Sequence, residues 1–306
     1  MKNNILILGG LCMDKYHYIE SFPINGEDTL IRNEKIVPGG CALNVSMTLK
    51  GLGVNPVIYS FCGDDIYSTH IETYLQEAGL DMQCIKKAQG SSLGYCYVFI
   101  DELGERTFMT SMGCEGHFDP QVISPKLLSE TEYFYLTGIY PAYKENNNSL
   151  CSFLKKSVEE GKKLIFDPGP LIESISQVVL EDLLSTTFIM TPSRNELSTI
   201  LRKLDFSIIE LFAAYSSLEY IVETNGEHGS TLYKRKGAPT YFPAINTEVR
   251  DTTGAGDSFT AGIIYGLASG LTIENSIKTA TICGALTANV EGPHRIITPE
   301  MIKKFL

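Results

Sequence analysis

Residues 251–262 of this chain read Asp251-Thr252-Thr253-Gly254-Ala255-Gly256-Asp257-Ser258-Phe259-Thr260-Ala261-Gly262. They lie between an extended segment, residues 247–250, and a helical pattern that runs from Phe259 to Leu271. Two glycines, Gly254 and Gly256, let the backbone turn sharply and approach a ligand closely. The unpaired amides that begin the following helix, together with the helix dipole, form a site for an anion.

A carboxylate, Asp257, lies at the edge of this anion site. A negative side chain repels phosphate, so its presence there needs a reason. Asp257 can accept a proton from a hydroxyl while the amides of Gly254, Ala255 and Gly256 stabilise a transferring phosphoryl group. The alternative is that Asp257 only caps a helix behind a glycine turn, which a lone GxGD pattern would favour. The full twelve-residue string is far more specific and favours catalysis.

A second glycine-rich block, residues 39–46, reads GGCALNVS. The two blocks resemble the C-terminal and N-terminal signatures of the ribokinase-like, or PfkB, carbohydrate kinases, and the resemblance runs from about Gly9 to Gly292. It implies an enzyme that phosphorylates a hydroxyl of a small sugar or sugar-like molecule, with ATP and Mg²⁺ as cofactors. It also implies a three-layer αβα sandwich with a mainly parallel sheet and a small β lid.

The order of apolar segments independently predicts an α/β fold. Short apolar runs alternate with amphipathic stretches, as in a parallel sheet covered by helices on both faces. The predicted strands are Ile5–Leu8, Val57–Phe61, Tyr133–Leu136, Lys163–Phe166, Thr187–Met190 and Tyr220–Glu223. The predicted helices are Ala42–Leu52, Ile66–Ala78, Ser149–Glu160, Arg194–Leu204, Gly256–Ala268 and Ile273–Asn289. No repeat or linker divides the chain, so we expect one kinase domain over residues 1–306.

Two segments interrupt this alternation, at about residues 15–37 and 92–112. The second reads as a β-hairpin in which Tyr95, Tyr97 and Phe99 alternate with smaller apolar residues. The resemblance implies that both segments form a lid over the substrate, although an ordinary surface hairpin is the alternative. Because both faces of the hairpin are apolar, we expect two copies of the lid to pack together in a homodimer.

Five residues are candidates for binding the sugar. Asp14 follows the first predicted strand, where a carboxylate can accept hydrogen bonds from vicinal hydroxyls; a turn-forming Asp is the alternative. The resemblance adds the Gly39 and Gly40 amides, the Asn44 side chain and Arg106 of the hairpin. Without it, the two glycines could be only a turn after Pro38.

The resemblance also implies a nucleotide site, formed by Ser193, Thr224, Gly226, Gly229 and Asn289. Ser193 stands where the family usually has an asparagine. Taken alone, the sequence of residues 224–230 would favour a hairpin turn.

Cation sites follow from the same resemblance. Glu196 would order Mg²⁺ through water, the alternative being a first-turn helix acid favoured by the dipole. Asp251 and Thr253 lie in a stretch that could supply oxygen ligands to K⁺.

Composition excludes several other classes of function. The net charge of −11 argues against nucleic acid as a partner, and no run of 18 apolar residues indicates a membrane span. The eight cysteines show no paired spacing and favour a reduced, cytoplasmic protein. The sequence lacks the P-loop and dinucleotide motifs.

The substrate is left open at this stage. A free sugar is the first hypothesis. A nucleoside, which would need an aromatic platform, is the second, and a sugar phosphate, which would need basic residues in the lid, is the third. A sugar-binding regulator without catalytic activity would predict loss of Asp257 or of the Gly254–Gly256 turn, and all of these residues are present.

Overall fold

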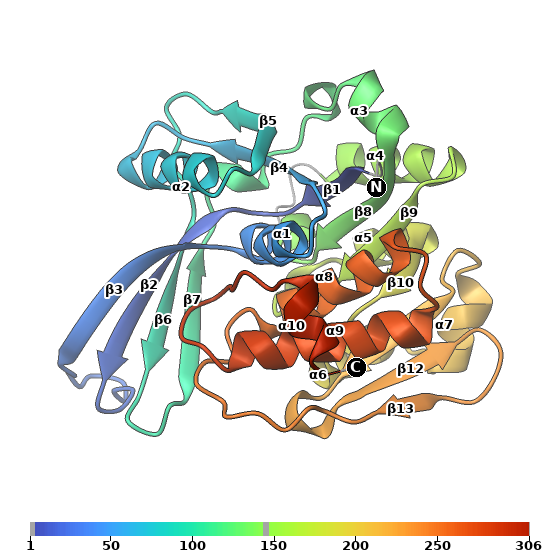
Figure 1. Ribbon diagram of the computed structural model, residues 1–306. Coiled ribbons are helices and arrows are strands. Elements are labelled where there is room, and N and C mark those ends of the chain that lie inside the picture. Colours follow the sequence, from blue (N-terminus) through green and yellow to red (C-terminus); the bar gives the residue numbers. More distant parts are fainter. Residues whose placement is uncertain (1–3, 143–146, 306) are drawn as a thin grey trace.

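The computed structural model describes residues 4–142 and 147–305. Within these ranges the chain forms a large sheet with helices on both faces (Figure 1). The strands of this sheet, in spatial order, are β13 (Thr240–Phe242), β12 (Ser230–Lys234), β11 (Tyr220–Thr224), β10 (Thr187–Met190), β9 (Lys163–Asp167), β8 (Thr131–Thr137), β1 (Asn4–Leu8), β4 (Pro56–Cys62) and β5 (Asp81–Lys87). All neighbours are parallel except β11–β12 and β12–β13. The predicted α/β class with a mainly parallel sheet is confirmed.

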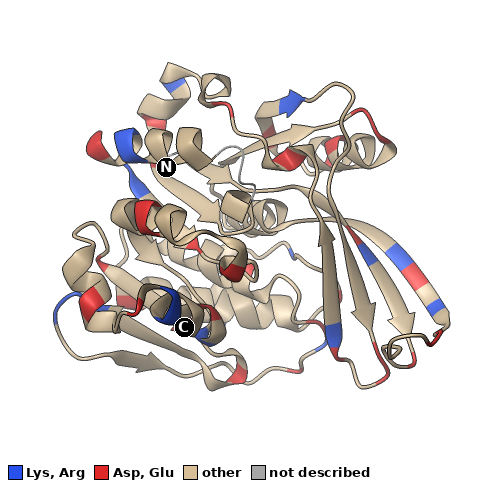
Figure 2. Ribbon diagram, turned by 180° about the vertical axis from the view of Figure 1, so that it is seen from behind, with Lys and Arg blue, Asp and Glu red and all other residues tan. Residues whose placement is uncertain are grey.

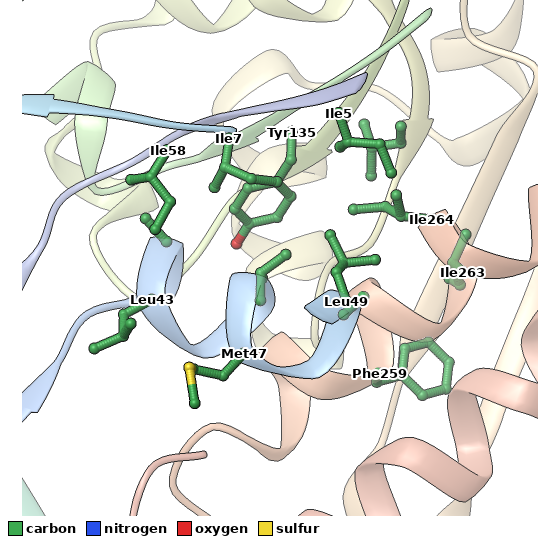
Figure 3. Close-up of a cluster of buried hydrophobic side chains, with 14 of the residues drawn as sticks. Ile5, Ile7, Leu43, Met47, Leu49, Ile58, Tyr135, Phe259, Ile263 and Ile264 are labelled. Atoms are coloured by element: carbon green, nitrogen blue, oxygen red, sulfur yellow. The ribbon is translucent and has the colours of Figure 1, made fainter. Parts of the chain in front are cut away.

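The side chains of β1 show why both faces of the sheet are covered. Ile5 and Ile7 point into one core cluster and Leu6 and Leu8 into the other, and all four are fully buried. The first cluster lies under α1 (Cys41–Gly51), α2 (Ile66–Glu77), α8 (Ala255–Ala268) and α9 (Ile273–Ala288), as Figure 3 shows for α1 and α8. The second lies under α3 (Pro125–Glu130), α4 (Asn147–Glu159), α5 (Gln177–Thr186), α6 (Arg194–Leu204) and α7 (Ile208–Ala214). The predicted three layers are therefore present.

Helices α8 and α9 pack unusually closely because α8 carries glycines at the contact. A Cβ on Gly262 would lie 2.5 Å from the Ala280 Cα, and one on Gly266 would overlap Ser276. Behind them, the Ser258 hydroxyl is hydrogen-bonded to Thr48 of α1 (3.0 Å) and to Thr287 of α9 (2.8 Å). These buried hydroxyls join the three helices beside the carboxyl ends of the strands.

A second sheet extends away from the body in Figure 1, and we call it the lid sheet. Its strands, in spatial order, are β3 (Ile31–Gly39), β2 (Cys12–Ile19), β6 (Tyr95–Ile100) and β7 (Arg106–Ser111). The hairpin expected in residues 92–111 is present as β6 and β7, and its side chains alternate between two faces. That this sheet closes over a ligand is still a prediction.

The predicted strands and helices match the observed ones to within about two residues, whereas several other elements were not predicted. These are β5, β12, β13, α3, α5, α7 and α10 (Pro299–Lys303). No helix in the described ranges is long and apolar enough to cross a bilayer. In Figure 2 the Lys and Arg positions are scattered among Asp and Glu, with no basic stripe in that view.

Candidate active site

Two cavities meet at the carboxyl ends of the central strands, where open α/β sheets bind ligands. The lid-side cavity, of about 670 Å³, lies between the lid sheet and the body. The hairpin-side cavity, of about 980 Å³, lies beside the β11–β12 hairpin. Thr224, Thr252 and Gly256 line both cavities. The predicted residues in the lid-side lining are Asp14, Gly40, Asn44, Arg106, Ser193, Glu196, Thr224, Thr253, Gly254, Gly256 and Asp257.

The turn at Gly254 begins helix α8 at the junction of the two cavities. Gly254 has φ +73°, and a Cβ there would lie inside the Pro293 carbonyl group, so only glycine fits. The Ala255 amide already donates to the Thr252 carbonyl (3.2 Å). Within the described residues the amides of Gly254 and Gly256 donate to no protein acceptor, and a Cβ on Gly256 would meet open space. Two of the three predicted amides are thus available to an anion.

Asp257 lies in the first turn of α8 and does not cap the helix, because the helix start has no side-chain cap. Its Oδ2 instead accepts a hydrogen bond from Asn44 Nδ2 (2.8 Å). Burial raises the pKa of Asp257, while hydrogen bonds from Asn44 and the Cys41 thiol oppose the rise. The capping alternative is therefore not what the geometry shows. Asp257 is a buried carboxylate facing the lid-side cavity.

Asp14, on β2 of the lid sheet, faces the same cavity and is 7% exposed. Burial, helped by the negative charges of Asp257 and Asp251, raises its pKa to about 7, although a hydrogen bond from the Cys12 thiol opposes this. A Cβ on Gly39 would overlap the Asp14 carboxylate, so the glycine makes room for it. Gly39 itself is not in the lining of either cavity.

Arg106, predicted to bind the sugar, forms an ion pair with Asp251 at 2.9 Å. It therefore joins the start of β7 to the turn before α8. The carboxylate of Asp251 also accepts from the amides of Thr253 (2.9 Å) and Gly292 (3.0 Å). Both of its oxygens are thus engaged by protein groups.

Ser193 and Glu196 form a capping box at the start of α6. Glu196 Oε2 accepts from the Ser193 amide (2.7 Å), and Ser193 Oγ accepts from the Glu196 amide (3.4 Å). Glu196 is therefore a first-turn helix acid, as the alternative predicted. Both Ser193 and Glu196 also line the lid-side cavity. Burial raises the pKa of Glu196, and the charge of Asp257 adds to the rise.

The sequence did not indicate Asp167, which ends β9 and lines the same cavity. Its pKa is raised by burial and then by the charges of Glu196 and Asp257, and it accepts a hydrogen bond from Thr260 Oγ1 (3.3 Å). Asp167 could have been found from its position, because a carboxylate after a predicted strand is the feature that identified Asp14. Among the described residues, no group of three or more His, Cys, Asp or Glu side chains has the geometry of a metal site.

The hairpin-side cavity contains the predicted Thr224, Gly226 and Gly229. Residues 224–230 do form a hairpin turn, since Thr224 pairs with Ser230 across β11 and β12, and that turn lines the cavity. Asn289 lines neither cavity, because its side-chain amide donates to the Glu248 carbonyl (2.8 Å).

Comparisons with known proteins agree with this architecture. An uncharacterised sugar kinase of Escherichia coli is 27% identical over 90% of this chain and 85% of its own. An ATP-dependent ribose-1-phosphate kinase of Halopiger xanaduensis is 23% identical over 99% of this chain and 97% of its own. The crystal structure of a Thermotoga maritima ribokinase superposes with a TM-score of 0.85 at 19% identity, covering 100% of this chain and 99% of that one.

Other relatives include nucleoside kinases and ribokinases. The model of the pfkB family carbohydrate kinases matches residues 2–300. The chain therefore belongs to the pfkB family of carbohydrate kinases.

Proposed function

We propose that this ATP-dependent kinase transfers the γ-phosphoryl group to a hydroxyl of a small free sugar, with Asp257 as the base. The observation that carries the proposal is the position of Asp257, a buried carboxylate beside a helix start whose Gly254 and Gly256 amides are unoccupied. The sugar would occupy the lid-side cavity and ATP the hairpin-side cavity. The two ligands would then meet at Gly256, which lines both.

The reaction follows from these positions. Asp14 and Asn44 hold hydroxyls of the sugar, so that one hydroxyl lies against the Asp257 carboxylate. As the oxygen of this hydroxyl attacks the γ-phosphorus, its proton passes to Asp257 and the bond to the β-phosphate oxygen breaks. The amides of Gly254 and Gly256 stabilise the negative charge on the transferring group. The lid sheet limits the access of water, which would otherwise accept the phosphoryl group.

The donor set also suits a magnesium ion. Asp167 and Glu196 face one cavity, and repulsion between them adds to the burial that raises the pKa of Asp167. A cation would relieve this repulsion, and Mg²⁺ commonly binds through few carboxylates, water and substrate phosphates. Bound there, it would neutralise charge on the phosphates of ATP. Potassium at the turn of Asp251 and Thr253 is a further proposal, with main-chain carbonyls as its ligands.

A free sugar is favoured over a sugar phosphate because the two candidate arginines of the lid already have acidic partners. Arg32 pairs with Glu20 and Glu102, and Arg106 pairs with Asp251. A nucleoside is the second candidate because Phe108, which lines the lid-side cavity, is 53% exposed and could contact a base. Release of ADP, measured over a panel of pentoses, hexoses, their phosphates and nucleosides, tests the order. Turnover confined to phosphorylated sugars would contradict it.

Asp14→Ala is expected to raise the KM for the sugar roughly 30- to 150-fold, the equivalent of about 2–3 kcal/mol, with little change for ATP. In the wild type, the KM for the sugar should fall as pH rises through about 7, because hydroxyls donate to the ionised form of Asp14. The variant should lose this pH dependence. Steady-state kinetics from pH 5.5 to 8.5 check both effects, and equal losses for sugar and ATP would instead indicate a folding role.

We also propose a homodimer formed through the lid sheets. Nine of the seventeen large apolar side chains exposed in the described residues lie in the lid segments, Ile36 and Phe108 among them. Such a concentration is unusual on a surface that faces only water. A cytoplasmic location is proposed as well, supported by ATP use and by eight cysteines that are all free.

Light scattering should therefore give about twice the chain mass of 33.8 kDa at micromolar concentration. Ile36→Glu, at a site that is 49% exposed in the lid, should shift the protein toward monomer because it places a charge in the apolar contact. Ile209→Glu, at an 81% exposed site on α7, is the matched control and should not. A wild-type monomer with or without sugar would overturn the dimer.

A further inference from the structure

A row of hydrogen bonds extends from Asp257 into the protein. Beyond the Asn44–Asp257 bond, Asn44 Oδ1 lies 3.2 Å from Nδ1 of His294, and His294 Nε2 lies 2.6 Å from the Tyr74 hydroxyl. The four residues come from α8, α1, the loop after α9 and α2. His294 and Tyr74 line neither cavity, so they have no direct access to a ligand.

The protons along this row follow by elimination. An ionised carboxylate can only accept, so the NH₂ group of Asn44 must face Asp257 and its carbonyl oxygen must face His294. Nδ1 of His294 therefore carries a proton. Burial lowers the pKa of His294 to about 4, so the ring is neutral near pH 7, and its bare Nε2 accepts from the Tyr74 hydroxyl.

The loop that carries His294 also supports the anion site from behind. The Gly292 amide donates to Asp251 (3.0 Å), and the Pro293 carbonyl packs directly on the Cα of Gly254. Three consecutive residues thus contact the two ends of the turn and, through Asn44, the carboxylate of Asp257. The loop therefore contacts both the turn that forms the anion site and the residue that orients Asp257.

We propose that His294 and Tyr74 are positioning residues for phosphoryl transfer, which fix the Asn44 amide so that its NH₂ group orients the Asp257 carboxylate. The inference rests on the role of Asp257 proposed above. Without the Tyr74 hydroxyl, the ring is free to carry its proton on Nε2, and Nδ1 would then present a lone pair to the Asn44 carbonyl. In that tautomer His294 no longer holds the Asn44 amide, and its NH₂ group orients the Asp257 carboxylate less well.

Weakening of the Asn44–Asp257 bond has a titratable signature. The hydrogen bond from Asn44 lowers the pKa of Asp257, so its loss leaves Asp257 protonated up to a higher pH. The acid limb of the kcat profile should move to higher pH accordingly. The other titratable groups that interact with Asp257 are Asp14, Asp167, Glu196, the Cys41 thiol and the Tyr135 hydroxyl. None of them is changed in the variants below.

The test compares Tyr74→Phe and His294→Leu with the wild type. We expect kcat to fall about 10-fold, the scale of one lost charge-assisted hydrogen bond, and the acid limb to move up by roughly half a pH unit or more. The KM for ATP should stay within about twofold. His294→Asn, whose amide nitrogen can replace the Nδ1 donor, should restore much of the rate. His70→Leu, at an exposed site on α2, is the matched control.

Three outcomes would overturn the inference. One is a wild-type pH profile in Tyr74→Phe with normal melting. The second is an equal loss of rate at every pH, and the third is no rescue by His294→Asn. Tyr74→Phe removes one hydroxyl and keeps the ring, so it tests the idea even if His294→Leu fails to fold. Full activity in Asp257→Asn would contradict the proposed role of Asp257 itself. An inactive Asp257→Asn together with an unaltered Tyr74→Phe would contradict only the role of His294 and Tyr74.

Discussion

Asp257→Asn should lower kcat by about 10²-fold or more, the usual scale for removal of a general base. The change is isosteric, and the oxygen of the new amide can still accept from Asn44, so fold and ATP affinity should be retained. Steady-state ADP release gives the rate, and calorimetric titration with ATP gives the affinity. Thermal melting checks the fold.

The matched control is Asp182→Asn, an exposed carboxylate on α5 under the opposite face of the sheet. It removes the same charge far from both cavities and should leave the rate unchanged. If Asp257→Asn phosphorylates its sugar near the wild-type rate, Asp257 has no catalytic role. A loss of ATP affinity as large as the loss of rate would instead indicate that the variant damages the nucleotide site.

Gly254→Ala should be nearly as damaging, for a steric reason. At φ +73° an alanine is strained by about 1–2 kcal/mol, and its Cβ would overlap the Pro293 carbonyl, so the turn must move. We expect a loss of kcat of at least about 10²-fold, because a displaced turn no longer aims its amides. The melting temperature should fall by several degrees.

Gly256→Ala is the natural comparison because its Cβ would enter open space. It should reduce activity by crowding the phosphate while leaving the melting temperature unchanged. Melting by circular dichroism, together with kinetics on both variants, separates strain from crowding. Equal melting temperatures and equal activities in the two variants would show that the Pro293 contact is relaxed at no cost.

Much of the fold could be predicted from the sequence because the signals were local. Each central strand is a short, continuous apolar run, since both of its faces are buried, and each long helix has its own periodic face. The last two strands at one end of the sheet, β12 and β13, are half exposed and carry a weaker pattern. The glycine turn at Gly254 was also local, since the φ angle and the helix start both follow from a few neighbouring residues.

The residues behind Asp257 could not be predicted, because their contacts join segments that are far apart in the sequence. Asn44 and His294 are 250 residues apart in the sequence. Neither the neighbours of His294 nor a motif spacing indicates that it has a role in the site. Asp167 was missed because a lone carboxylate after a strand is common. The partners of Arg106 and Asp251 depend on how the lid sheet meets the body, a relation that no segment of sequence carries alone.

The loop of Gly292, Pro293 and His294 has a consequence for synthesis of the chain on the ribosome. Asp14 on β2 and Asn44 on α1 emerge early, and Asp257 follows much later. The turn before α8 is braced only once this loop has also left the exit tunnel. A nascent chain stalled before residue 291 would therefore carry the base and the glycines without their support. Such a nascent chain should remain inactive until residues 292–294 have taken their place against the turn.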